Sequence, residues 1–284
     1  MRDHPASLRG NLKCWKYFVT KRSDTGKAGS ISMFAIAAFS PRSTDPQRKR
    51  VTTVNELLGR VFSFEKTVFP DSRELFGKLS TEGQSPKALM ISCADSRIVP
   101  EQIMQAEPGE LFVCRNAGNM VPSYATMNGG VSSTVEYAVV ALGVRDIIVC
   151  GHSDCGAMKA LAAPEEPKGM PNVVAWLRHG AAAEHVISSC APHLHGDERV
   201  RAVSLQNIIA QIDHLRTHPS VAAAIARGEM ALHGWFVDIT AGVVLGLDGD
   251  TGQFVPMRED RPLPVALPAY VRVANEPSYA VAAE

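Results

Sequence analysis

Hydrophobic positions along the chain alternate between helical stripes and short continuous runs. Apolar residues from Val54 to Phe62 recur at positions i, i+3, i+4, i+7 and i+8, which predicts one amphipathic helix. Apolar runs of strand length follow at residues 87–93, 110–115 and 145–150. Because continuous apolar runs are typical of strands covered on both faces, these segments predict the buried strands of a parallel sheet.

The remaining pattern adds helices around these strands. Helical periodicity over residues 131–142 lies between the second and third strand, and a strand, helix, strand order predicts a parallel crossover. Further helices are predicted at 171–183 and 197–216, and a closing strand pair at 235–239 and 243–247. We therefore predict a single α/β domain with a central, mainly parallel β-sheet flanked by helices.

The first fifty residues differ from the rest of the chain. Residues 1–50 carry eleven Lys or Arg and three Asp, without a sustained hydrophobic period, so we expect little fixed structure there. The apolar stretch at 31–39 after basic residues resembles a targeting signal, while a disordered tail and a true start nearer Met33 are the alternatives. The domain is predicted to span 51–262 and a tail 263–284.

Composition excludes several classes of function. The 29 basic residues equal the 29 acidic ones in number, so no net charge favours nucleic acid or an anionic membrane as a partner. The longest apolar run, at 31–39, is about half of the roughly 20 residues that a membrane span needs. Six cysteines are too sparse for a disulfide scaffold, which favours reduced thiols and a cytoplasmic location.

Two predicted strands end in unusual polar clusters. Cys93 is followed by Asp95 and Arg97, and the third strand is followed by His152 and Cys155. Ligands of open parallel sheets bind at the carboxyl ends of the strands, and thiolate and imidazole are ligands that zinc prefers. If the two strands are neighbours, three ligands meet and leave a fourth position for water, as in catalytic zinc sites. The other cysteines are not expected to be ligands: Cys14, Cys114, Cys150 and Cys190.

With these motifs, the chain resembles the β-class carbonic anhydrases, in their plant-like and bacterial subgroup. The resemblance runs from about Leu57 to Leu247. The segments that carry it are Cys93-x-Asp95-x-Arg97, Pro108-Gly-Glu-Leu-Phe112, Arg115-Asn-Ala-Gly-Asn119, Glu136-Tyr137-Ala138 and Gly151-His152-x-x-Cys155-Gly156.

The resemblance implies a function and a set of roles. One zinc ion per chain would be bound by Cys93, His152 and Cys155, and a zinc-bound hydroxide would convert carbon dioxide to bicarbonate and a proton. Asp95 and Arg97 would form the catalytic dyad, with Asp95 as a fourth ligand in an inactive state. The residues that match the substrate pocket of the family are Gln84, Phe112, Ala117, Tyr137 and Gly156.

The resemblance also implies self-association as a dimer or higher oligomer, with the helix that begins at Val54 lying across a partner.

Three alternative functions remain open from the sequence. Hydrolysis of carbonyl sulfide or carbon disulfide uses the same metal site, and a structural zinc module would need Asp95 to close that site permanently. A zinc base deaminase is disfavoured because the chain lacks its glutamate beside the histidine ligand and its closely spaced cysteine pair.

Overall fold

The computed structural model describes residues 54–124 and 129–259. The chain divides into two units, residues 1–57 and 58–284, and the helix α1 (Val54–Ser63) runs across that boundary. The predictions for residues 1–50 and 263–284 lie outside the described residues. Within the described ranges, no helix is long and apolar enough to cross a membrane.

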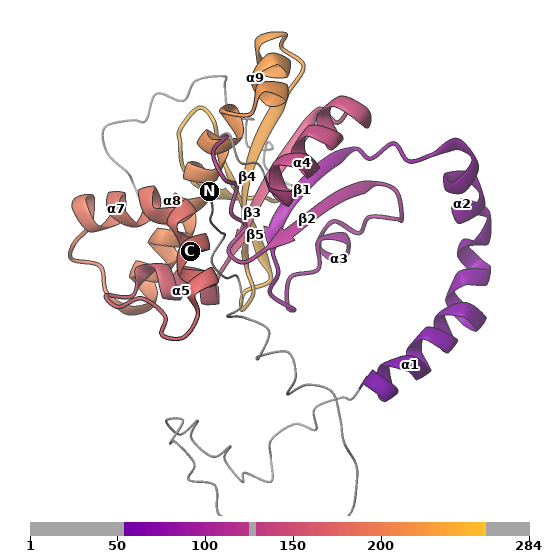
Figure 1. The fold of residues 1–284 in the computed structure, drawn as a ribbon, viewed down its shortest axis with the longest axis horizontal. Coiled ribbons are helices and arrows are strands. Elements are labelled where there is room, and N and C mark those ends of the chain that lie inside the picture. The colour runs from indigo at the N-terminus through magenta and orange to yellow at the C-terminus, as the bar shows by residue number, and fades with distance from the viewer. Residues whose placement is uncertain (1–53, 125–128, 260–284) are drawn as a thin grey trace, which may run out of the picture. The chain divides into compact units, whose positions relative to one another are not determined.

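The second unit contains one sheet of six strands (Figure 1). The strands lie in the order β2-β1-β3-β4-β5-β6. The first four of that order are mutually parallel, and β5 and β6 are antiparallel additions. This confirms the predicted α/β class with a mainly parallel sheet. The strand bounds are β1 (Ala88–Cys93), β2 (Leu111–Asn116), β3 (Asp146–His152), β4 (Ala231–Asp238), β5 (Val243–Leu247) and β6 (Phe254–Pro256).

Helices precede the first parallel strand and connect the parallel strands to one another. Two of them continue into single π-helical turns, η2 and η3, and η4 is a short 3₁₀ segment. Beyond α1, the bounds are η2 (Phe64–Val68), α2 (Phe69–Glu82), α3 (Pro100–Met104), α4 (Gly130–Glu136), η3 (Tyr137–Ala141), α5 (Gly156–Ala162), α6 (Pro171–Leu177), η4 (Arg178–Gly180), α7 (Ala181–Cys190), α8 (Gly196–Arg216) and α9 (Pro219–Ala226).

The sheet is covered on both faces, as its continuous apolar runs predict. Alternate residues of a strand point to opposite faces. Leu89 and Ile91 therefore join one core cluster with α4, α8 and α9, while Met90 joins another with α3. A third cluster, built on α5 to α8, lies at the carboxyl edge and includes Cys93 and Cys155. The carboxyl edge of the sheet, with Cys93 and Cys155, is thus packed against the helices α5 to α8.

Several element bounds differ from the prediction for physical reasons. The helix predicted from Val54 continues through η2 and α2 to Glu82, although no residue of η2 or α2 is buried. The strand β4 begins four residues before the predicted 235. The predicted start was too late because His233 and Gly234 interrupt the apolar run of this strand. Gly234 is required there, since a Cβ would lie 2.9 Å from Cγ2 of Ile208 in α8.

Candidate metal centre

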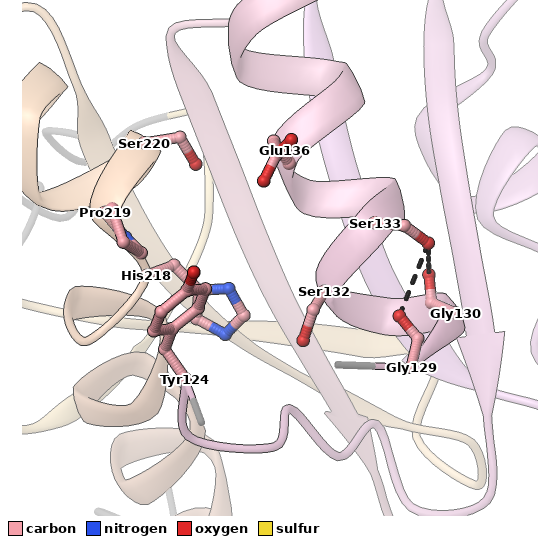
Figure 2. A pocket seen from close by; sticks show the side chains of 9 residues that line it. All are labelled: Tyr124, Gly129, Gly130, Ser132, Ser133, Glu136, His218, Pro219 and Ser220. Carbon is pink, nitrogen blue, oxygen red and sulfur yellow. Dashed lines mark hydrogen bonds between the residues drawn. The ribbon is translucent and has the colours of Figure 1, made fainter. Parts of the chain in front are cut away.

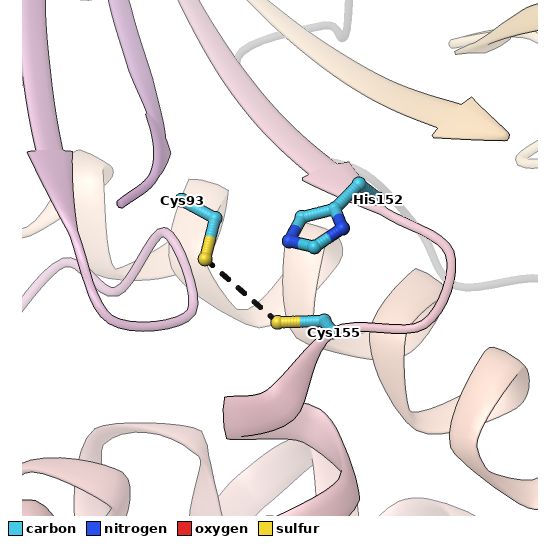
Figure 3. A group of neighbouring side chains, drawn as sticks. All are labelled: Cys93, His152 and Cys155. Carbon is cyan, nitrogen blue, oxygen red and sulfur yellow. Dashed lines mark hydrogen bonds between the residues drawn. The ribbon is translucent and has the colours of Figure 1, made fainter. Parts of the chain in front are cut away.

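Three metal-ligating side chains converge at the carboxyl edge of the sheet (Figure 3). Cys93 is the last residue of β1, His152 is the last residue of the neighbouring β3, and Cys155 caps the start of α5. The two Sγ atoms are 3.9 Å apart, and the three ligand atoms all lie within 4.8 Å of one another. Among the described residues this is the only such group of three.

The imidazole of His152 fits a metal ion. Its Nδ1 lies 2.8 Å from the Ser153 carbonyl oxygen, which can only accept, so Nδ1 carries the hydrogen. Nε2 therefore presents a lone pair, yet this atom is buried and has no hydrogen-bond partner. A buried polar atom without a partner is costly, and coordination to a metal would satisfy it.

The two thiols also fit a cation. Hydrogen bonds from Cys155 and from the Gly118 N–H, which lies 3.4 Å from Cys93 Sγ, hold the pKa of Cys93 well below its usual range, against the effect of burial. The thiolate at Cys93 in turn raises the pKa of Cys155, and burial adds to that rise. The two sulfur atoms thus lie where a divalent cation would stabilise both as thiolates.

Asp95 and Arg97 form a closely bonded pair beside this group. Arg97 donates from Nε to Asp95 Oδ1 at 2.9 Å and from Nη2 to Oδ2 at 2.7 Å, and its backbone N–H donates to Oδ1 at 3.0 Å. The Arg97 side chain is the main cause that holds the pKa of the Asp95 carboxyl well below its usual range, against the opposing effect of burial. Asp95 is therefore ionised and its oxygens are directed towards Arg97.

Two of the predicted pocket residues lie at this same edge. Ala117 follows β2, and its carbonyl oxygen accepts a hydrogen bond from Trp176 Nε1 at 2.9 Å. Gly156 is the first residue of α5, directly after Cys155, and a Cβ built on it would meet no atom within 4 Å. The space beside Gly156 is therefore open in the single chain.

The other three predicted pocket residues lie at the opposite end of the sheet. Gln84 precedes β1, and Phe112 pairs in register with Leu89, four residues before Cys93. Four residues of a strand span about 13 Å. The rings of Phe112 and Tyr137 contact each other at 5.9 Å between centroids, and Tyr137 is 52% exposed. Within one chain, these residues are not brought together with the metal-ligating group.

The chain is similar in sequence to known proteins. A family model described as carbonic anhydrase matches residues 88–244. A carbonic anhydrase of Pseudomonas aeruginosa is 46% identical over 231 residues, covering 81% of this chain and all of that protein. Carbonic anhydrase 1 of Escherichia coli O157:H7 is 47% identical over 204 residues, covering 72% and 92%. The chain belongs to the β-carbonic anhydrase family.

Solved structures agree with this assignment. The β-carbonic anhydrase CcaA superposes with a TM-score of 0.70 at 40% identity, over 73% of this chain and 93% of that one. One of two tetrameric β-carbonic anhydrases from Sordaria macrospora gives 0.63 at 28% identity, over 72% and 100%. The general reaction of the family is the hydration of carbon dioxide. All four relatives are carbonic anhydrases, so the alternative of carbonyl sulfide or carbon disulfide hydrolysis has no support.

One charged contact beside the candidate metal centre was not predicted from the sequence. Asp154, between two ligand candidates, accepts a hydrogen bond from Arg97 Nη1 at 2.7 Å and pairs with Lys159. Lys159 and then Arg97 lower the pKa of Asp154 to about 2. The carboxylate inside the motif was a visible signal. No feature of the sequence indicated the left-handed backbone of Asp154, with φ of 58°, or its contact with a partner 57 residues away.

A separate cavity of about 320 Å³ lies between α4 and the start of α9 (Figure 2). Tyr124, Ser132, Glu136 and His218 are among its lining residues, and the Tyr124 and His218 rings meet edge to face at 5.8 Å. No residue of the metal-ligating group or of the Asp95–Arg97 pair lines it. This cavity is therefore distinct from the candidate metal centre.

Proposed function

We propose that this chain catalyses the reversible hydration of carbon dioxide to bicarbonate and a proton, with one zinc ion held by Cys93, His152 and Cys155. The observation that carries the proposal is the convergence of three soft ligand atoms within 4.8 Å, one of them a buried imidazole nitrogen without a partner. When bound, zinc would act as a Lewis acid that lowers the pKa of a water in the position left open by three protein ligands.

Asp95 has the role of an oriented hydrogen-bond acceptor. Three N–H groups of Arg97 already engage its carboxylate, so its orientation is fixed and its charge is balanced. In this state it can accept a hydrogen from the reacting water and turn a lone pair of that water towards carbon dioxide. Arg97 suits this task because a guanidinium stays charged and binds a carboxylate through two parallel hydrogen bonds.

The activity is tested by stopped-flow hydration of carbon dioxide on samples of graded zinc content. The protein is stripped with a chelator and reloaded with increasing amounts of zinc, and each sample is analysed for metal. We expect the rate to rise in proportion to zinc and to reach its maximum at one ion per chain. A fully loaded protein without hydration activity would contradict the proposed function.

We further propose that the chain self-associates and that a second copy supplies Gln84, Phe112 and Tyr137 to the substrate pocket. These residues lie at the amino edge of the sheet, away from the ligands of their own chain. The apolar side chains of Leu58, Val61 and Phe62 are about half exposed, as expected for a surface that a partner covers. The tetrameric state of the Sordaria relatives supports an assembly of this kind.

Complementation between two defective chains tests the shared pocket. Gln84→Ala removes the amide that would bind bicarbonate, and Cys155→Ser removes a zinc ligand. If the pocket is shared, a mixed dimer purified through two different tags has one complete site of two and about half of the wild-type rate. If each chain uses its own Gln84, the mixed dimer has no complete site and stays as inactive as the two parent variants.

A further inference from the structure

Arg97 lies between two carboxylates that belong to different loops. One edge of its guanidinium binds Asp95, on the loop that follows β1. The other edge binds Asp154, on the loop that follows β3, through Nη1 to Oδ2 at 2.7 Å and through Nη2 to the backbone oxygen at 3.1 Å. Four of its five N–H donors are thereby used, and both loops carry metal-ligating residues.

We propose that Asp154 is a positioning residue of the hydration reaction, which holds Arg97 so that Asp95 stays paired with Arg97 and away from the metal. The inference rests on the proposed function. Asp95 and Arg97 are two residues apart on one loop, so their mutual pair does not fix them relative to His152 and Cys155. The bond to Asp154 supplies that link, because Asp154 lies between those two ligands in the chain.

The placement of Asp154 is itself supported on two sides. Its second oxygen, Oδ1, accepts from Lys159 in α5, so each carboxylate oxygen has its own cationic partner. Its backbone is left-handed, with φ of 58°, a conformation that Asp tolerates better than most residues. That conformation accompanies the contact between the Asp154 carbonyl oxygen and Arg97 Nη2. Isolated ion pairs at a surface contribute little, but here four charged side chains form one network of three ion pairs.

Loss of Asp154 has a specific consequence for the metal. Arg97, whose side chain is 43% exposed, would lose its charged partner on the loop that follows β3, keep its bonds to Asp95 and the one bond to the backbone oxygen of residue 154, and could turn towards solvent. Asp95, no longer held in place through Arg97, would then rotate to the metal and compete there with water and with small anions. A purely electrostatic role predicts the opposite, since removing a negative charge near the metal should strengthen anion binding.

Azide binding to the cobalt-loaded protein separates these two roles without any need for hydration activity. Cobalt replaces zinc in the purified full chain, and visible absorption follows the titration with azide. We expect Asp154→Ala to weaken azide binding about tenfold, the size of losing a hydrogen bond to a charged group. Asp154→Asn, which keeps the shape and one acceptor oxygen, should weaken it less. Glu166→Gln changes the charge of an exposed acidic residue outside the network and should match the wild type.

The double variant Asp154→Ala/Asp95→Asn completes the test. An amide at position 95 is a poor metal ligand, so azide affinity should return to that of Asp95→Asn alone. The proposal is overturned if azide binds the Asp154 variants as tightly as the wild type or more tightly, or if the double variant fails to recover. A wild type that lacks hydration activity at full zinc content would contradict the proposed function and leave the azide titration to decide the role of Asp154.

Discussion

Gly118 couples the metal centre to the packed support beneath it, and its replacement by alanine has a calculable cost. Its φ is +78°, a left-handed conformation that costs an L-residue about 1–2 kcal/mol. A Cβ there would lie 2.9 Å from both Ala157 Cβ and Met158 Cε. Overpacking of this kind costs about 1–3 kcal/mol, so Gly118→Ala should lose about 2–5 kcal/mol of unfolding free energy.

The surrounding bonds leave the segment little room to relax. The Gly118 N–H donates to Cys93 Sγ, its carbonyl oxygen accepts from Asn207 Nδ2 at 3.1 Å, and the preceding carbonyl accepts from Trp176. A shift that relieved the clash would lengthen at least one of these bonds. Gly118→Ala should therefore also release zinc to a chelator faster than the wild type.

Gly228→Ala is the matched control, because Gly228 has φ of +70° and no atom within 4 Å of its Cβ position. Gly228→Ala should lose only the unfolding free energy that the left-handed conformation costs an L-residue, about 1–2 kcal/mol. Urea unfolding of both zinc-loaded variants is measured at one protein concentration, since the stability of an assembly depends on concentration. Equal unfolding free energies for the two variants would refute the steric argument at Gly118.

Three further substitutions test separate parts of the account. Cys155→Ser should lose most of its zinc while the exposed Cys190→Ser keeps it, as metal analysis of the purified proteins will show. Asp95→Asn should keep zinc and lose most hydration activity in stopped-flow assays, and an unchanged rate would remove Asp95 from the mechanism. Burial raises the pKa of Asp238. Hydrogen bonds from two turn N–H groups and from Arg201 together lower this pKa by more than burial raises it, so the net shift is downward. The charge of Asp238 therefore stabilises the fold above its unfolded pKa of about 3.9. Asp238→Asn should cost about 1 kcal/mol at pH 7 and progressively less below about pH 4, and a urea-unfolding difference that does not shrink would contradict this sign.

The strands that position the metal centre could be predicted because their signal is local. The runs at 87–93 and 145–150 contain the continuous apolar segments 88–91 and 147–150, and β1 and β3 begin within one residue of the two runs. The start of β4 could not be predicted, because Gly234 is needed to make room for Ile208 of α8, which lies close to it. That contact joins distant parts of the chain and leaves no periodic trace.

The site was predictable as a set of residues and less so as an arrangement. Cys93, His152 and Cys155 meet because their strands are neighbours, which the sequence pattern allowed but did not require. The separation of Phe112 from that group depends on strand register, and resemblance to a family matches positions without giving distances. The contact of Asp154 with Arg97 depends on a left-handed residue, which composition and spacing do not reveal.

The central claim is that two cysteines and one histidine hold the zinc ion and leave one position open. X-ray absorption at the zinc edge of the wild-type protein counts these ligands directly. The account predicts two sulfur atoms at about 2.3 Å and two lighter nitrogen or oxygen atoms, with one sulfur lost in any zinc that Cys155→Ser retains. A spectrum with no sulfur, or with three or four sulfur ligands, would contradict it.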